Sequence, residues 1–240
     1  MRSKTVYCLL CLKLIIIFDG YLLCSCQKNY TPEQKKWVLA TTALVFEVNK
    51  ERHDILAGVE AIPKNIDADK KALNEWWGIN SREDLLNSLM WIEESGHRKS
   101  FEEMAHYISS INEKQFKEMI EKMDISKRNK WETVSRYWFS VGKKSLIGWD
   151  YCRYIALCRW GYLAGYLSEK ETWVKIIPIA RMLQKTFDSW SDLGDNYIIG
   201  RTFWSYEQME GNKYLYYKAY NKLIQDADSP WKKIPWNLKL

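Results

Sequence analysis

Hydrophobic residues recur every three or four positions over most of this chain, which is the period of an amphipathic α-helix. The pattern is densest over residues 149–166, where the charged residues are Asp150, Arg153 and Arg159. A helix that is apolar on nearly every face is expected to be buried. We therefore predict that residues 149–166 form the central helix, and that Gly161 and Gly165 let a neighbouring helix approach closely.

Start and stop signals predict helices on both sides of this segment. Thr31 followed by Pro32 predicts a helix that runs to about Arg52. Gly78 and Gly96 are expected helix ends. Further helix starts are expected at polar N-cap candidates, namely Asp67, Ser81, Ser100, Asn112, Ser126, Ser168 and either Asp195 or Asn196.

The remaining pattern supports a single helical domain. The last predicted helix covers residues 214–224, and residues 229–236 are expected to be a non-helical tail that packs its two tryptophans back on the domain. No strand-like alternation extends beyond a few residues. The 13 tryptophans and 15 tyrosines provide ample apolar surface for one core. We predict an all-α fold, a single multi-helix domain with orthogonal or bundle-like packing over residues 32–240.

The first 25 residues are typical of a targeting segment. Arg2 and Lys4 give a basic start, and apolar stretches follow at residues 6–12 and 14–18. Lys13 and Asp19 interrupt the apolar region. An uncleaved anchor and an incorrectly chosen start codon therefore stand as alternatives to a cleaved signal peptide.

Residues 23–26, Leu-Cys-Ser-Cys, resemble a bacterial lipobox, in which cleavage precedes the final cysteine and that cysteine carries lipid. The resemblance implies a signal peptide over residues 1–25, lipidation with palmitate or a related acid at Cys26, and an anchor spacer over residues 26–31. It also implies an envelope protein attached to a membrane by lipid. In a two-membrane cell the outer membrane is favoured, because Gln27 stands where inner-membrane retention signals carry Asp.

The charge distribution argues against a nucleic-acid partner. The chain has 36 basic and 30 acidic residues, and removal of residues 1–25 leaves 33 and 29. The charges alternate in sign along the predicted helices, and no basic block with interleaved aromatic residues occurs. The expected partners are a membrane, through the lipid, and a protein that the sequence does not identify.

The sequence predicts neither a metal site nor a cofactor. His53 and His106 lie on separate predicted helices with no cysteine or carboxylate at ligand spacing. Cys152 and Cys158 would lie roughly 9 Å apart along one helix axis, too far for a disulfide, and are expected in the core. The chain has no glycine-rich phosphate loop and no nucleophile elbow.

A candidate polar cluster lies on the predicted central helix. Asp150 and Arg153 are three residues apart and therefore share a helix face, where they must be paired or solvated through a cleft. One interpretation is a buried ion pair, extended by Arg201 or Glu169, that fixes the helix register. The other is a pocket in which Arg153 and Arg201 hold an anionic group while Asp150 orients it.

His97, beside Arg98 and directly after Gly96, is a further candidate. It has the chemistry of a general acid or base. As a residue in the last turn of a helix it would instead bond the exposed helix carbonyls, and we favour that interpretation.

Several motifs follow one another along the chain: Trp76-Trp77-Gly78-Ile79, Ser81 to Leu85, Gly96-His97-Arg98, Trp149-Asp150 with Arg153, Gly161, Gly165-Tyr166, Glu169 with Trp173, Ser189-Trp190, and Asn196 with Gly200-Arg201 and Trp204. Together they resemble the bacterial domain-of-unknown-function family numbered 1266. The resemblance covers about residues 73–205. It implies a domain boundary but no activity.

The residue pattern is compatible with two classes of function. A non-enzymatic binding or scaffold domain is favoured, because no motif places a nucleophile beside a base. The alternative is an enzyme or ligand-binding protein that acts on an anionic substrate at a polar pocket. The candidate residues of that pocket are His97, Arg98, Asp150, Arg153, Glu169 and Arg201.

Overall fold

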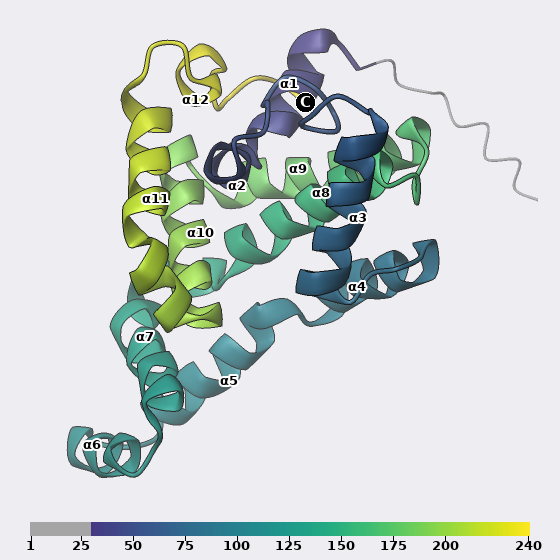
Figure 1. The fold of residues 1–240 in the computed structure, drawn as a ribbon. Coiled ribbons are helices and arrows are strands. Elements are labelled where there is room, and N and C mark those ends of the chain that lie inside the picture. Colours follow the sequence, from purple (N-terminus) through teal and green to yellow (C-terminus); the bar gives the residue numbers. More distant parts are fainter. Residues whose placement is uncertain (1–29) are drawn as a thin grey trace, which may run out of the picture. The chain divides into compact units, whose positions relative to one another are not determined.

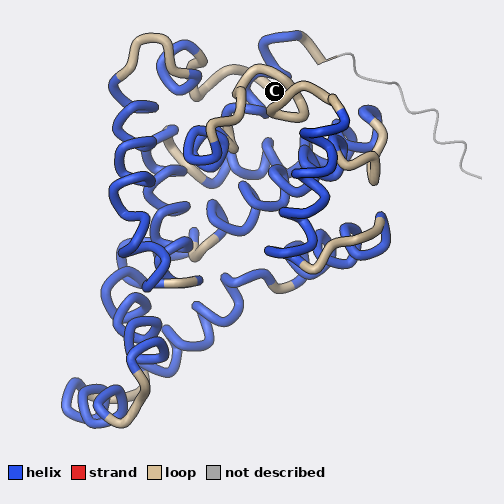
Figure 2. The backbone as a smooth tube through the Cα atoms, in the orientation of Figure 1, coloured by secondary structure: helices blue, strands red, loops and turns tan. Residues whose placement is uncertain are grey.

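The computed structural model describes residues 30–240, and within that range it contains helices and no strands (Figure 2). The all-α prediction is confirmed. Thr31–Leu240 form one compact unit. The expected signal peptide, the lipidation site Cys26 and the spacer up to residue 29 lie outside the described residues. Across residues 30–240, no helix combines the length and the apolar character that a bilayer crossing requires.

Figure 1 shows the order of the elements along the chain. They are α1 (Pro32–Ala40), α2 (Ala43–Asn49), α3 (Pro63–Trp77), α4 (Arg82–Glu94), α5 (Gly96–Ser109), α6 (Glu113–Glu121), α7 (Ile125–Val141), the 3-10 turn η1 (Gly142–Lys144), α8 (Ile147–Leu163), α9 (Glu169–Thr186), α10 (Trp190–Trp204), α11 (Tyr206–Gln225) and α12 (Pro230–Lys233).

α8 is the central helix, although it spans Ile147–Leu163 rather than residues 149–166. Fourteen of its residues are buried, and it packs against α3, α4, α5, α9 and α10 (Figure 1). A Cβ at Gly161 would overlap Leu85 of α4, so the missing side chain permits the close approach that the sequence predicts. Gly165 differs: its φ is 81°, and it turns the chain after α8, with open space where a Cβ would lie.

The single helix expected over residues 32–52 is two helices, because the chain turns at Thr41 and Thr42. Both threonine hydroxyls donate to carbonyl oxygens of the preceding turn. Arg159 of α8, which is fully buried, donates to the Leu39 carbonyl at 3.2 Å and also to the Thr42 hydroxyl. A side chain distant in sequence therefore supports the break.

Arg159 also holds the loop that follows α2. It donates to the carbonyl oxygens of Leu56 and Ile55, each at 2.9 Å. Burial lowers the pKa of Arg159 to about 9, and its guanidinium lies 3.5 Å from the centre of the Phe46 ring. The N-terminal segment is thus fastened to the centre of the domain by one buried cation.

Helix starts set by adjacent residues are predicted correctly, whereas others are wrong. Ser81, Asn112 and Ser168 cap their helices as expected. α3 begins at Pro63, four residues before Asp67, because proline at the first position lacks a donor that would be unpaired there. Two further helices begin earlier than predicted: α5 at Gly96 and not after Ser100, and α11 at Tyr206 and not at residue 214. Two others have a different cap: Asp124 and not Ser126 caps α7, and Ser189 and not Asp195 or Asn196 caps α10.

The expectation of a non-helical C-terminal tail is wrong for Pro230–Lys233, which form the short helix α12 behind the cap Ser229, but the two tryptophans pack back on the domain as predicted. The Trp231 indole donates to the Ala40 carbonyl at 2.9 Å, and the Trp236 indole donates to the Phe187 carbonyl at 3.1 Å. The Trp190 ring centre lies 6.1 Å from that of Trp231 and 4.7 Å from that of Trp236. This cluster joins the tail to α1 and α10.

Candidate functional site

Asp150, in the first turn of α8, is fully buried and caps the start of α5. The backbone N–H groups of His97 and Arg98 donate to its two oxygens, each at 3.0 Å. Gly96 precedes them with φ 57°, and a Cβ there would overlap the Asp150 carboxylate. Because the first N–H groups of a helix lack partners within it, this carboxylate pairs them and stabilises the positive end of the helix dipole.

Two arginines also contact the Asp150 carboxylate. Arg98 Nη1 lies 3.2 Å from one oxygen, and Arg153 Nη2 lies 2.8 Å from the other. Arg98 also donates to the carbonyl oxygens of Ile92 and Glu93 at the end of α4, each at 2.5 Å. An ionised carboxylate in the interior requires such partners, because an unpaired charge there is costly. Asp150 therefore joins α4, α5 and α8.

The Arg153 guanidinium lies among three tryptophan rings. Its Cζ is 4.2 Å from the ring centre of Trp149, 5.2 Å from Trp77 and 6.0 Å from Trp91. Burial lowers the pKa of Arg153, and the Asp150 charge opposes that shift. A guanidinium stays protonated in proteins, so Arg153 is a buried cation with aromatic faces around it.

His97 lies in the first turn of α5, so it does not bond the last carbonyls of α4, and Arg98 does so instead. The Trp149 indole and Arg153 Nη2 lie 3.2 and 2.7 Å from His97 Nδ1. Two donors converge on this atom, so the ring proton is on Nε2. Burial and then the Arg153 charge lower the pKa of His97 to about 3. The imidazole is neutral, and its 3.8 Å approach to Asp150 is not an ion pair.

Arg201, on α10, is 6% exposed and has no carboxylate partner among residues 30–240. Its Nε donates to the Tyr216 hydroxyl at 3.2 Å, and its Nη2 donates to Gln208 Oε1 at 3.1 Å. The Trp204 ring centre lies 4.6 Å from its Cζ. Arg201 Nη1 is buried and has no hydrogen-bond partner. An unpaired buried donor on a cation is costly, so this atom requires an explanation.

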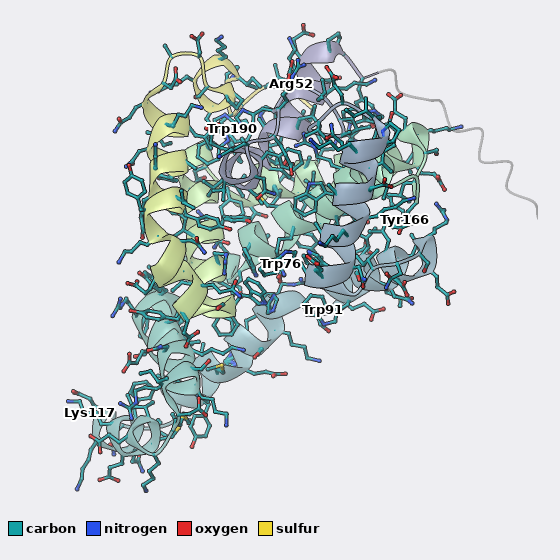
Figure 3. All side chains as sticks on the ribbon, in the orientation of Figure 1. Arg52, Trp76, Trp91, Lys117, Tyr166 and Trp190 are labelled. Atoms are coloured by element: carbon teal, nitrogen blue, oxygen red, sulfur yellow. The ribbon has the colours of Figure 1, made fainter. Side chains whose placement is uncertain are left out.

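His97, Arg153 and Arg201 line one cavity of about 970 Å³. Its floor is one face of α8, and its walls come from α2, α3, α4, α5, α10 and α11. Trp76 and Trp91, both labelled in Figure 3, line the cavity and are 63% and 40% exposed, so they lie at its opening. Six tryptophans contribute to the lining: Trp76, Trp77, Trp91, Trp149, Trp160 and Trp204.

The cavity also carries two carboxyl groups that the sequence analysis did not select. Glu51, in the loop after α2, accepts a hydrogen bond from the Trp160 indole at 3.1 Å. Asp69, on α3, has one buried oxygen without a hydrogen-bond partner. Burial, with a smaller contribution from the Glu51 charge, raises the pKa of Asp69 to about 7. One cavity therefore holds arginines and poorly solvated acids.

The structure brings together five of the six sequence candidates. His97, Arg153 and Arg201 line the cavity, while Asp150 and Arg98 support His97 and Arg153 from behind. Glu169 is exposed, accepts a hydrogen bond from the Trp173 indole at 3.2 Å and does not line the cavity.

No short spacing links Glu51, Asp69 and Gln208 to the arginines in the sequence, which explains why sequence reasoning missed them. For Asp69 the sequence contains one signal: no basic residue lies three or four positions away, so its carboxyl group has no ion-pair partner on its own helix. Its place beside Glu51 is defined only by the three-dimensional arrangement.

The fold and the cavity define an all-helical domain with a charged, aromatic-lined cavity beside its central helix. The chain belongs to the family described as protein of unknown function (DUF1266), whose pattern matches residues 72–236.

Two relatives come from Escherichia coli strain K12. The uncharacterized protein YbeU is 24% identical over 177 residues, which are 68% of this chain and 75% of YbeU. The uncharacterized protein YbeR is 25% identical over 133 residues, which are 55% of this chain and 56% of YbeR. No solved structure matches the chain.

Proposed function

We propose that this domain binds a small anionic molecule in the cavity between α3, α8, α10 and α11. The observation that carries the proposal is the Nη1 atom of Arg201, which is buried, unpartnered and part of a side chain that lines the cavity. A ligand oxygen at this atom would remove the cost of an unmade charged hydrogen bond.

The charge balance around Arg153 and Arg201 favours an anionic ligand. Arg98 and Arg153 share the single carboxylate of Asp150, and Arg201 adds a further positive charge without a carboxylate partner. The aromatic rings lie near the guanidinium carbons of Arg153 and Arg201. In-plane N–H groups of a guanidinium are the donors that bind carboxylate or phosphate oxygens.

The aromatic walls favour a ligand with a flat apolar part. Ligand cavities in proteins are mostly apolar with a few fixed polar groups, and this cavity has that composition. The proposed ligand therefore joins a carboxylate or phosphate to an apolar, preferably aromatic, body.

Binding fits the cavity better than catalysis at His97. With a pKa of about 3 and two donors on Nδ1, the imidazole does not accept a proton from a substrate near neutral pH. Its function in the proposal is to hold Arg153 and Trp149 in place. Cys152 and Cys158 are buried, and burial raises the pKa of both thiols, so neither is an activated nucleophile.

The test compares naphthoate, naphthyl phosphate and neutral naphthamide by calorimetry, with tryptophan fluorescence as a second readout. At least one anion is expected to bind about tenfold or more tightly than the amide, because a hydrogen bond to a charged group contributes roughly 1.5–3 kcal/mol. Arg201→Met should remove this preference. It should not lower the melting temperature markedly, because it removes a buried charge that has no carboxylate partner.

Arg136→Met is the matched control, since Arg136 is exposed on α7 and does not line the cavity. This variant should bind like the parent protein. Equal affinity for the amide and the anions, or an anion preference that survives Arg201→Met, would contradict the proposal.

We also propose that the mature protein is attached to a membrane of the cell envelope by lipid on Cys26. The lipobox-like Leu-Cys-Ser-Cys of residues 23–26 and the basic start of the chain support this location. Metabolic labelling with a fatty-acid analogue tests it. Cys26→Ser should abolish the label and Cys24→Ser should retain it, whereas label on the Cys26→Ser protein would refute the assignment.

A further inference from the structure

The cavity is elongated along α8 and has groups of opposite charge at its two ends. Arg153, Ala156 and Trp160 lie three and four residues apart on the face of α8 that forms the floor. At 1.5 Å per residue, Arg153 and Trp160 are separated by about 10 Å along the helix axis. Glu51 is bonded to the Trp160 indole, so its carboxylate marks the end of the cavity remote from Arg153.

The carboxyl groups of the acidic end have no ion-pair partner among the described residues. Glu51 accepts bonds from Trp160 and Asn49, and neither Glu51 nor Asp69 forms an ion pair within residues 30–240. The positive charge that acts on Glu51 is that of Arg159, whose guanidinium donates to backbone carbonyls and does not bond to Glu51. One Asp69 oxygen is buried without a partner, so this end has an unused acceptor.

Apolar residues line the cavity between the two ends. Ala156 lies on the floor between Arg153 and Trp160, and α2 and α3 contribute Val45, Val48, Ala72, Leu73 and Trp76 to the lining. A ligand that extends from Arg201 and Arg153 toward Glu51 and Asp69 would therefore contact hydrocarbon in its middle and carboxyl groups at its far end.

We infer that the ligand carries an anionic group at one end and a protonated amine about 10 Å away at the other, joined by an apolar segment. The anion binds Arg201 and Arg153, and the ammonium donates to Asp69 and Glu51. This inference rests on the proposed anion site and names the chemistry of the other end. Arg201 supplies the independent sign of a ligand, because its side chain is 6% exposed and its Nη1 is unpartnered.

An adverse feature of the acidic end supports the same assignment. Glu51 and Asp69 line the same cavity, and the Glu51 charge acts on Asp69, so the two carboxyl groups repel each other when both are ionised. A bound ammonium would relieve both that repulsion and the missing hydrogen bond at Asp69. A ligand of the same length with no hydrogen-bond donor at this end would relieve neither, and a neutral donor would relieve the missing hydrogen bond alone.

The test compares octanoate with ω-aminooctanoate by calorimetry at about pH 8 on the full domain. The extended ω-amino acid is about 10 Å long and reaches both ends. It is expected to bind about tenfold more tightly than octanoate, because one charge-assisted hydrogen bond is gained. γ-Aminobutanoate is too short to span the cavity and should show no comparable gain.

Asp69→Asn should reduce the advantage of the amine, because Glu51 is then its one remaining acceptor, and leave the affinity for octanoate unchanged or higher. Asp67→Asn is the matched control, since Asp67 is exposed on the same helix and does not line the cavity, and it should keep the advantage.

Binding of octanoate without any gain from the amine would overturn the inference and leave the anion site intact. An undiminished gain in Asp69→Asn, or no measurable binding of ω-aminooctanoate, would also overturn it. Failure of the anion site itself is read from the naphthalene series, which contains no amine.

Discussion

The strongest test of the site architecture is removal of the Asp150 carboxylate. Asp150→Ala would leave two N–H groups at the start of α5 unpaired and would remove the carboxylate that Arg98 and Arg153 share. The carboxylate is 0% exposed, so water does not replace it without rearrangement. Removing one partner of a buried ion pair costs about 3–5 kcal/mol, and two helix-capping bonds are lost as well.

We therefore expect Asp150→Ala to lower the free energy of unfolding by about 4 kcal/mol or more. The assay is urea denaturation followed by circular dichroism, with the slope compared between variants. For a domain of this size the loss corresponds to a fall in melting temperature of about 10 °C. Asp150→Asn keeps one acceptor oxygen but introduces an amide that faces donors, so it should lose most of the same stability.

Glu169→Gln is the control, because Glu169 is an exposed carboxylate near the start of α9 that also accepts an indole hydrogen bond. Its effect should be below about 1 kcal/mol. The Asp150→Ala loss should change little with salt, since buried pairs are screened weakly. A loss below about 1 kcal/mol would refute the conclusion that this carboxylate holds α4, α5 and α8 together.

Gly96→Ala should destabilise the domain by more than Gly165→Ala in thermal melts, because both positions have positive φ but only a Cβ at Gly96 would overlap Asp150; equal losses would contradict this. Arg159→Met should lower stability by about 3 kcal/mol and increase proteolysis of residues 50–58, because buried carbonyls lose their donor; an unchanged cleavage rate would count against it. Asp69→Asn should stabilise the protein by about 1–2 kcal/mol at pH 8 after allowance for solvent screening, and by nothing below about pH 4. The reason is that the pKa of Asp69 is raised from 3.8 to about 7 in the folded protein. Between these pH values the folded protein binds more protons than the unfolded chain, so the parent protein loses stability as the pH rises through this range. The measurement is urea denaturation of parent and variant across this pH range. A difference in unfolding free energy that does not change with pH would refute the last prediction.

Sequence reasoning was most successful where a residue and its partner are adjacent in the chain. The Ser81 and Ser168 caps bond to N–H groups three residues ahead, so the pattern that predicts them is local. The start of α5 was missed because its cap is Asp150, which is 53 residues from His97. Helix signals alone contain no information on a cap supplied by another helix.

The same limit applies to the cavity. The pairing of Asp150 with Arg153 follows from helix spacing, and their burial follows from the apolar character of α8. The location of Arg201 beside the same cavity depends on how α10 packs on α8. The contact between Arg201 and Tyr216 of α11, which is 8% exposed, likewise depends on how the helices pack.

The family match covers the residues at one end of the cavity and not those at the other. The family match begins at residue 72, so Arg153 and Arg201 lie inside the matched range, while Glu51 and Asp69 precede it. A relative with another segment in front of the shared helices would keep the arginines that bind the anion and would have different residues at the opposite end of the cavity. Under the proposed function, selectivity within the family would then change by exchange of an N-terminal segment, without any alteration of the helices that hold the anion.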